Sequence, residues 1–82
     1  MKHKLWGILW REENKLDGEN SHLIYSDGFP ILFKTRKETR NYIKLHYGYI
    51  QKRIELRSEP HGWKMPIPIK VEIIKADGGV NG

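Results

Sequence analysis

The chain has 82 residues, of which 15 are Lys or Arg and 10 are Asp or Glu, so its formal net charge at pH 7 is +5. It has no cysteine, which excludes disulfides and thiolate–metal sites and is typical of a reducing compartment. No stretch approaches the ~20 apolar residues of a membrane span, and no apolar run of signal-peptide length follows the first residues. We therefore expect a cytoplasmic protein without a membrane partner.

The positive charge is concentrated in the middle of the chain. Residues 34–57 hold eight Lys or Arg against two Glu, whereas residues 1–29 hold four against five and residues 58–82 are balanced. Such clustering is typical of a surface that binds nucleic acid or another polyanion. The alternative is the solvated face of an ordinary helix.

The first third of the chain predicts short strands. In residues 3–11, Trp6, Ile8 and Trp10 alternate with Leu5 and Leu9, which is typical of a strand covered on both faces. Polar residues without periodicity predict a loop at 12–21. Two further short strands are expected at 22–26 and 31–33, separated by a turn at 27–30, which together give a three-stranded antiparallel meander.

A helix should follow at residues 36–47. Thr35 and Glu38 form a capping box, in which the Thr35 hydroxyl accepts the Glu38 N–H and the Glu38 carboxylate reaches back to the Thr35 N–H. Gly48 is expected to end the helix in a left-handed conformation. The spacing predicts a buried stripe made of Thr39, Tyr42, Ile43 and His46.

The remainder predicts a connection and a last strand. Residues 49–60 fit either a helix or a strand, with Ile50, Ile54 and Leu56 on the core. Residues 67–73 alternate like a half-buried strand, and Pro66 and Pro68 place that strand at an edge or at its own start. The fold class is therefore α+β, ordered β-β-β-α-β, with one helix on one sheet face. Residues 1–76 form a single domain and 77–82 a flexible tail.

Trp63 has two interpretations. Gly62 and the prolines on either side hold it in a nearly fixed place, so it either contacts a partner or fills the core. The core interpretation is favoured, because a domain this small can hardly leave a Trp unused.

Seven basic residues are the candidate nucleic-acid-binding residues, and three aromatic residues are candidate base contacts. The aromatic residues are Tyr47, Tyr49 and Trp63. The basic residues are Arg36, Lys37, Arg40, Lys44, Lys52, Arg53 and Arg57.

No pattern of catalysis or metal binding is evident. The four histidines, His3, His22, His46 and His61, do not pair at ligand spacing, and His46 is expected on the buried face of the helix. His61 with Glu55 or Glu59 would be an acid–base pair only if the fold brought them together. We expect no metal, no cofactor and no enzymatic activity.

The segments "PILFKTRKETRNYI" and "YGYIQKRIELRSEPHGWKMP" resemble short phage and prophage proteins of uncharacterised function, over about residues 29–73. The resemblance implies a phage origin and a shared fold, without an activity. Residues 6–43 are more loosely similar to integrase arm-type and AP2-like DNA-binding domains, which lay a three-stranded sheet in the major groove. Here the strand with Trp6 is more apolar than a groove-reading strand, and the basic residues lie on the helix.

Three functions follow from these observations. The first is nucleic-acid binding through the basic helix flank, with affinity that falls steeply with salt. The second is a phage-encoded factor that binds or inhibits a host protein through an apolar anchor. The third, ranked last, is a small enzyme with a closed cleft.

Overall fold

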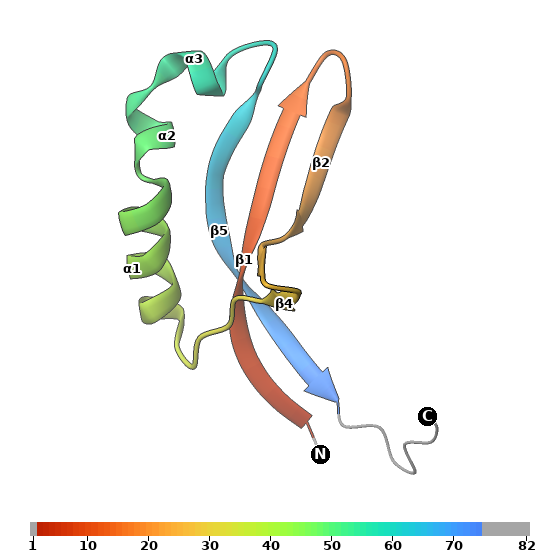
Figure 1. Ribbon diagram of the computed structural model, residues 1–82, viewed down its shortest axis with the longest axis vertical. Helices are drawn as coiled ribbons and strands as arrows, with labels where there is room; N and C mark the ends of the chain where they lie inside the picture. The colour runs from red at the N-terminus through yellow and green to blue at the C-terminus, as the bar shows by residue number, and fades with distance from the viewer. Residues whose placement is uncertain (1, 75–82) are drawn as a thin grey trace.

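The computed structural model confirms a small α+β domain and describes residues 2–74 (Figure 1). The flexible tail predicted at 77–82 and the domain boundary at 76 lie outside these residues. The elements are β1 (Lys2–Asn14), β2 (Gly18–Leu23), β3 (Tyr25–Ser26), β4 (Phe29–Pro30), α1 (Arg36–Tyr47), α2 (Tyr49–Lys52), α3 (Ile54–Arg57) and β5 (Trp63–Ile74).

The main sheet has three antiparallel strands in the order β2-β1-β5. β1 is central, as its apolar residues on both sides predict, and β5 pairs with it from Lys2 to Glu12, beside it in Figure 1. β5 is an edge strand, in agreement with its two prolines, which have no N–H to donate to a second neighbour. The helices lie beside β5, and α1 packs on β5 and β1.

The loop predicted at residues 12–21 is wrong. β1 continues to Asn14 and β2 starts at Gly18, so only residues 15–17 form the turn. The Asn14 side chain closes the turn, because its Oδ1 accepts a hydrogen bond from the Asp17 N–H at 2.7 Å. The polar residues form strands because their backbones pair: Glu12 lies opposite both Asn20 of β2 and Trp63 of β5.

The third strand of the expected meander is reduced to a single bridge. Residues 25–30 form the short β3–β4 hairpin, whose turn has positive φ at Asp27 and Gly28. Phe33 then bridges Trp6, with N–H···O distances of 2.8 Å in both directions. Residues 31–33 thus contact β1 beyond the end of β2 without forming a regular strand.

The start and end predicted for α1 are confirmed. The Glu38 N–H donates to Thr35 Oγ1 at 3.1 Å. The second half of the box differs, because the Glu38 carboxylate accepts from the Thr35 hydroxyl at 2.9 Å.

Gly48 does not have the predicted left-handed conformation. Its φ is −59°, and the chain continues through it into α2 and α3. Gly suits the position for a steric reason, since a Cβ there would lie 2.5 Å from the Lys44 carbonyl oxygen.

The core lies between α1, α2 and the sheet. Ile8, Ile43 and Ile50 are buried, and Thr39 is buried with its hydroxyl donating to the Thr35 carbonyl oxygen at 2.9 Å. The prediction for His46 is wrong: it is exposed and stacks on Tyr42, since the sheet covers only the narrower stripe around Thr39 and Ile43.

The ambiguous segment 49–60 is helical as far as Arg57, in the two short helices α2 and α3. Ile50 is buried and Leu56 is half-buried, as predicted, but Ile54 is 67% exposed. Arg53 has an extended backbone, with φ −113° and ψ 99°, which separates α2 from α3 and breaks the helical phase. Ile54 therefore does not share a face with Ile50.

Candidate functional site

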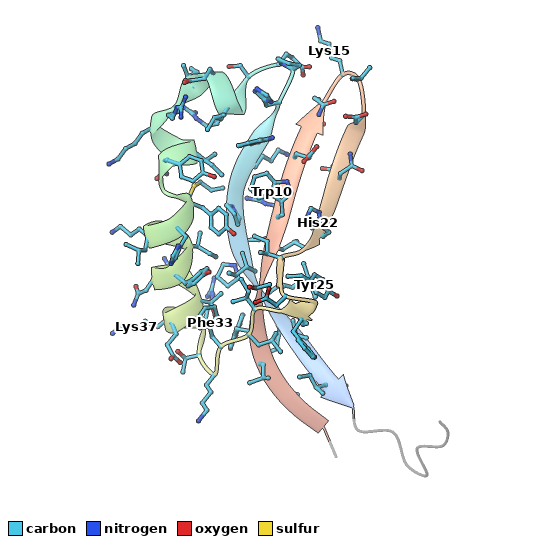
Figure 2. All side chains as sticks on the ribbon, in the orientation of Figure 1. Trp10, Lys15, His22, Tyr25, Phe33 and Lys37 are labelled. Carbon is cyan, nitrogen blue, oxygen red and sulfur yellow. The ribbon has the colours of Figure 1, made fainter. Side chains whose placement is uncertain are left out.

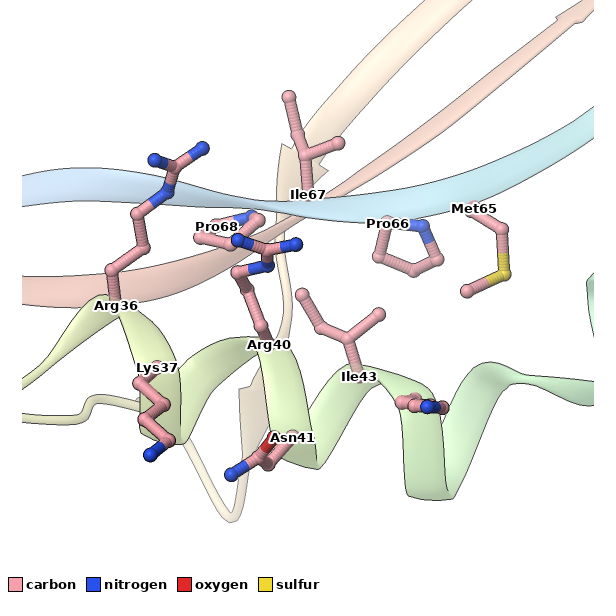
Figure 3. A pocket seen from close by; sticks show the side chains of 10 residues that line it. Arg36, Lys37, Arg40, Asn41, Ile43, Met65, Pro66, Ile67 and Pro68 are labelled. Carbon is pink, nitrogen blue, oxygen red and sulfur yellow. The ribbon is translucent and has the colours of Figure 1, made fainter.

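A groove of about 620 Å³ separates the flank of α1 from β5 (Figure 3). Its α1 side carries four of the seven predicted basic residues, which we call the basic flank: Arg36, Lys37, Arg40 and Lys44. Its other side, which we call the apolar wall, consists of Met65, Pro66, Ile67 and Pro68. Ile43 lies between them, and in Figure 3 Arg36, Arg40 and Ile43 point toward β5 whereas Lys37 points away.

The groove runs along the outer edge of β5. Successive side chains of a strand point to opposite faces, yet the four consecutive residues of the apolar wall all line the groove. A ligand can therefore contact all four residues only from the edge of the strand, because each face presents only every second side chain. This edge is free within the described residues, because β5 pairs only with β1 there.

The edge of β5 offers few backbone donors at the groove. The Ile8 carbonyl oxygen accepts a hydrogen bond from the Ile24 N–H at 2.9 Å, so the backbone groups of Ile8 face away from β5. Pro68 is the partner of Ile8 in the antiparallel ladder, and its backbone groups therefore face the outer edge. Its nitrogen has no proton, and the same holds for Pro66.

The groove is electrostatically one-sided. No Asp or Glu lines it, and within residues 2–74 no ion pair engages a residue of the basic flank. Arg36, Arg40 and Lys44 follow each other at intervals of four residues, so they form a row with steps of about 6 Å along the helix axis. A row of unneutralised cations of this kind attracts a chain of negative charges.

Lys70 is a further basic residue near the basic flank, and charge clustering does not predict it. Its Nζ lies 5.6 Å from the centroid of the Trp6 ring, and the Arg36 guanidinium carbon lies 6.0 Å from the same centroid. Lys70 and Trp6 are direct cross-strand partners. Only the pairing of β5 with β1 brings Lys70 to the ring that Arg36 also contacts, and Lys70 does not line the groove itself.

The other three predicted basic residues do not line the groove. Lys52 lies on α2, Arg57 on α3, and Arg53 between the two short helices. Arg53 Nε donates to a Glu55 carboxylate oxygen at 2.9 Å. The hydrogen bond from the backbone N–H of Glu55, and after it the one from Arg53, lowers the pKa of that carboxyl. The structure therefore separates the predicted residues into a groove set and a helix-end set.

The predicted aromatic contacts lie outside the groove as well. Tyr47 is half-buried with its ring edge-on to Trp10, at 6.2 Å between centroids, and Trp63 is half-buried against the same Trp10. Burial raises the pKa of the Tyr47 hydroxyl. Tyr49 is 44% exposed and is the accessible member of the three.

The histidines do not converge. His22 is exposed on β2 opposite Trp10 (Figure 2). His61 lies beside Trp63, with 5.3 Å between the ring centroids. Among the described residues no group of three or more His, Asp or Glu side chains is arranged to hold a metal ion. No helix of residues 2–74 is long and apolar enough to cross a membrane.

Comparison with protein-family models, curated proteins and solved structures gives no match for this chain. The resemblance to phage proteins and the looser one to integrase arm-type domains therefore stay predictions.

Proposed function

We propose that the protein binds nucleic acid through the groove between α1 and β5. The observation that carries the proposal is that four cationic side chains line one groove from which carboxylates are absent. The overall charge of +5 favours the same class of ligand. We assign the primary contacts to the basic flank, with Lys52, Arg53 and Arg57 outside it.

The basic flank would contact phosphate oxygens. Arg36 and Arg40 can each donate two parallel hydrogen bonds to a phosphate, whereas Lys37 and Lys44 act as point charges. Phosphate contacts fix position and orientation without reading sequence. The proposed activity is therefore binding with little sequence preference.

Fluorescence anisotropy with labelled DNA and RNA, over a range of salt concentrations, tests the proposal. The logarithm of the affinity should fall linearly with the logarithm of the salt concentration, because each neutralised phosphate releases counterions. The double variant Arg40→Glu/Lys44→Glu should lose affinity at least ~100-fold at low salt, since each reversed charge removes a favourable contact and adds a repulsive one.

The matched control is Lys52→Glu/Arg57→Glu, which changes the net charge equally but outside the groove. It should lose much less affinity than the groove variant. Equal losses in both variants would contradict the assignment to the groove, and no binding at low salt would contradict the function itself.

A second candidate function is binding to a host protein. Its support is the β3–β4 hairpin, where Tyr25 and Phe29 are 58% and 75% exposed, together with the exposed Leu45 and Ile54 of the helical layer. Large apolar side chains in such positions are typical of protein interfaces. In the phage setting that the resemblance implies, the partner would be a cytoplasmic protein of the host.

Affinity capture from a bacterial lysate tests this second function. A single partner retained at high salt by the wild type and lost with Phe29→Ser would support it. Retention that disappears at moderate salt, or that survives in Phe29→Ser, would contradict it.

A further inference from the structure

We infer that the ligand of the groove is a single strand of nucleic acid, with its phosphates on the basic flank and its bases on the apolar wall. The inference rests on the proposed function and specifies its substrate class. Three features of the groove carry it.

The first feature is the composition of its two sides. One side of the groove is cationic and the other is apolar, where Ile67 is 38% exposed, Met65 and Pro68 are half-buried and Pro66 is buried. Unstacked bases need an apolar surface, and a single strand exposes them. A duplex keeps its bases stacked inside and presents phosphates first, so it would leave the apolar wall uncovered.

The second feature is the spacing of the cations. Arg36, Arg40 and Lys44 lie in one row with steps of about 6 Å along the axis of α1. Consecutive phosphates of an extended strand are separated by a comparable distance. The row therefore matches one phosphate per cation along a single strand.

The third feature excludes the main alternative for an extended ligand. A peptide normally joins a free sheet edge as an additional strand, through main-chain hydrogen bonds. Pro66 and Pro68 remove two donors from this stretch of edge, so an acidic peptide would lack the regular ladder there. A ligand held by side chains, as a nucleic-acid strand is, loses nothing from the prolines.

The test compares fluorescein-labelled thymidine oligomers with a duplex of mixed sequence, using the full chain and anisotropy across a salt series. The single strand should bind at least ~10-fold more tightly than the duplex. If three or four phosphates are neutralised, the plot of log affinity against log salt concentration for the single strand should have a slope of about −2 to −3. Affinity should level off at about four nucleotides, because the row from Arg36 to Lys44 spans only ~12 Å, which three consecutive phosphates cover.

The decisive variant changes the apolar wall and leaves its charge unchanged. Met65→Gln/Ile67→Thr should weaken the single strand about five-fold at every salt concentration, since it removes apolar contacts with the bases. The salt slope should not change, and neither should the affinity for the duplex. Circular dichroism of the variant verifies that the fold is retained, and Ile67→Val, which keeps an apolar branched side chain, serves as the conservative control.

The possible failures are distinguishable. Equal affinity for single strand and duplex, lost in Arg40→Glu/Lys44→Glu but unaffected by the apolar-wall variant, would overturn the inference and leave the proposed function standing. No binding of either nucleic acid at low salt would overturn both. Tighter binding of a polyglutamate peptide of equal charge than of the oligomer would identify an acidic protein segment as the occupant and also overturn the inference.

Discussion

The indole rings of Trp10 and Trp63 meet edge to face, with their centroids 5.2 Å apart and their planes inclined by 72°. Tyr47, at the end of α1, meets Trp10 in the same way at 6.2 Å. The three rings thus join β1, β5 and α1 at the end of the molecule where the strands are otherwise polar. Aromatic pairs of this geometry contribute about 0.5–1.5 kcal/mol beyond the area that they bury. The arrangement explains why a Trp is needed at the start of β5.

Replacing Trp63 by Ala should therefore destabilise the fold. Because the side chain is half-buried, we expect a loss near the lower end of the range for large aromatic residues, about 3 kcal/mol. Trp63→Phe, which keeps a ring against Trp10, should lose less than half of that. Denaturant unfolding measures both, and a Trp63→Ala protein as stable as the wild type would show that Trp63 is not part of the core.

Gly62 should tolerate no side chain. Its φ is +65°, its carbonyl oxygen accepts from the Glu13 N–H at 2.9 Å, and a Cβ added there would lie 1.8 Å from the Glu13 carbonyl oxygen. Gly62→Ala should therefore cost well over the ~1–2 kcal/mol of a left-handed backbone alone. Gly18→Ala is the control, because Gly18 also has positive φ but no atom within 4 Å of the added Cβ. Thermal unfolding of the two variants separates the steric clash from the backbone strain, and similar melting temperatures would contradict the packing of residue 62 against β1.

The Thr35 cap makes a separate contribution. Its hydroxyl accepts the Glu38 N–H, which has no partner inside α1. Thr35→Ala should reduce the free energy of unfolding by about 1 kcal/mol, and Thr35→Ser should largely retain it. Urea titration of the three proteins measures the difference. If Thr35→Ala and Thr35→Ser unfold alike, the cap does not stabilise the helix.

Stability should also depend on the ionisation of Tyr47. Burial raises the pKa of its hydroxyl above the ordinary 10.0, and the neighbouring Tyr42 and Tyr49 raise it further. The folded state holds the proton more tightly than the unfolded chain, so this contribution to stability is complete below the unfolded pKa and is lost as the pH rises through the folded one.

The variant Tyr47→Phe removes this titration and keeps the ring against Trp10. Between pH ~9 and pH ~11 the wild type should lose more stability than Tyr47→Phe does. Urea midpoints at both pH values give the comparison, and the other alkaline titrations are shared by the two proteins. If the two proteins lost the same stability between these pH values, the Tyr47 hydroxyl would be equally solvated in the folded and the unfolded state.

The sequence predicted those features that neighbouring residues determine. The cap of Thr35 on the Glu38 N–H, the α1 bounds, and the edge position of a strand with Pro66 and Pro68 all depend on local geometry and were correct. The hairpin at residues 12–21 was missed because its polar residues carry no periodicity, and its strands form through pairing with distant partners.

The candidate site likewise combines residues that local spacing predicts with residues that only tertiary packing brings together. Arg36, Lys37, Arg40 and Lys44 share one helix flank by their spacing alone. The apolar wall and Lys70 come from a strand about 30 residues further along the chain, and only the packing of β5 beside α1 creates the groove. Lys52 and Arg57, close in sequence to the flank, lie on the short helices α2 and α3 outside the groove. Charge along the sequence therefore predicted which helix flank is basic but not the shape of the groove.

The basic flank should lower the stability of the free protein. Arg40 is exposed, lies four residues from both Arg36 and Lys44, and has no ion-pair partner within residues 2–74. Like charges at this spacing destabilise a helix by about 0.2–0.5 kcal/mol per pair, so Arg40→Gln removes two unfavourable pairs. The free energy of unfolding of Arg40→Gln should rise by roughly 0.4–1 kcal/mol at low salt, and its affinity for nucleic acid should fall.

Arg53→Gln is the contrasting variant, because it breaks the ion pair with Glu55 and should not raise the free energy of unfolding. A destabilised Arg40→Gln protein would mean that this side chain supports the fold, whereas a more stable protein with weaker binding is the trade-off expected of a residue kept for a ligand.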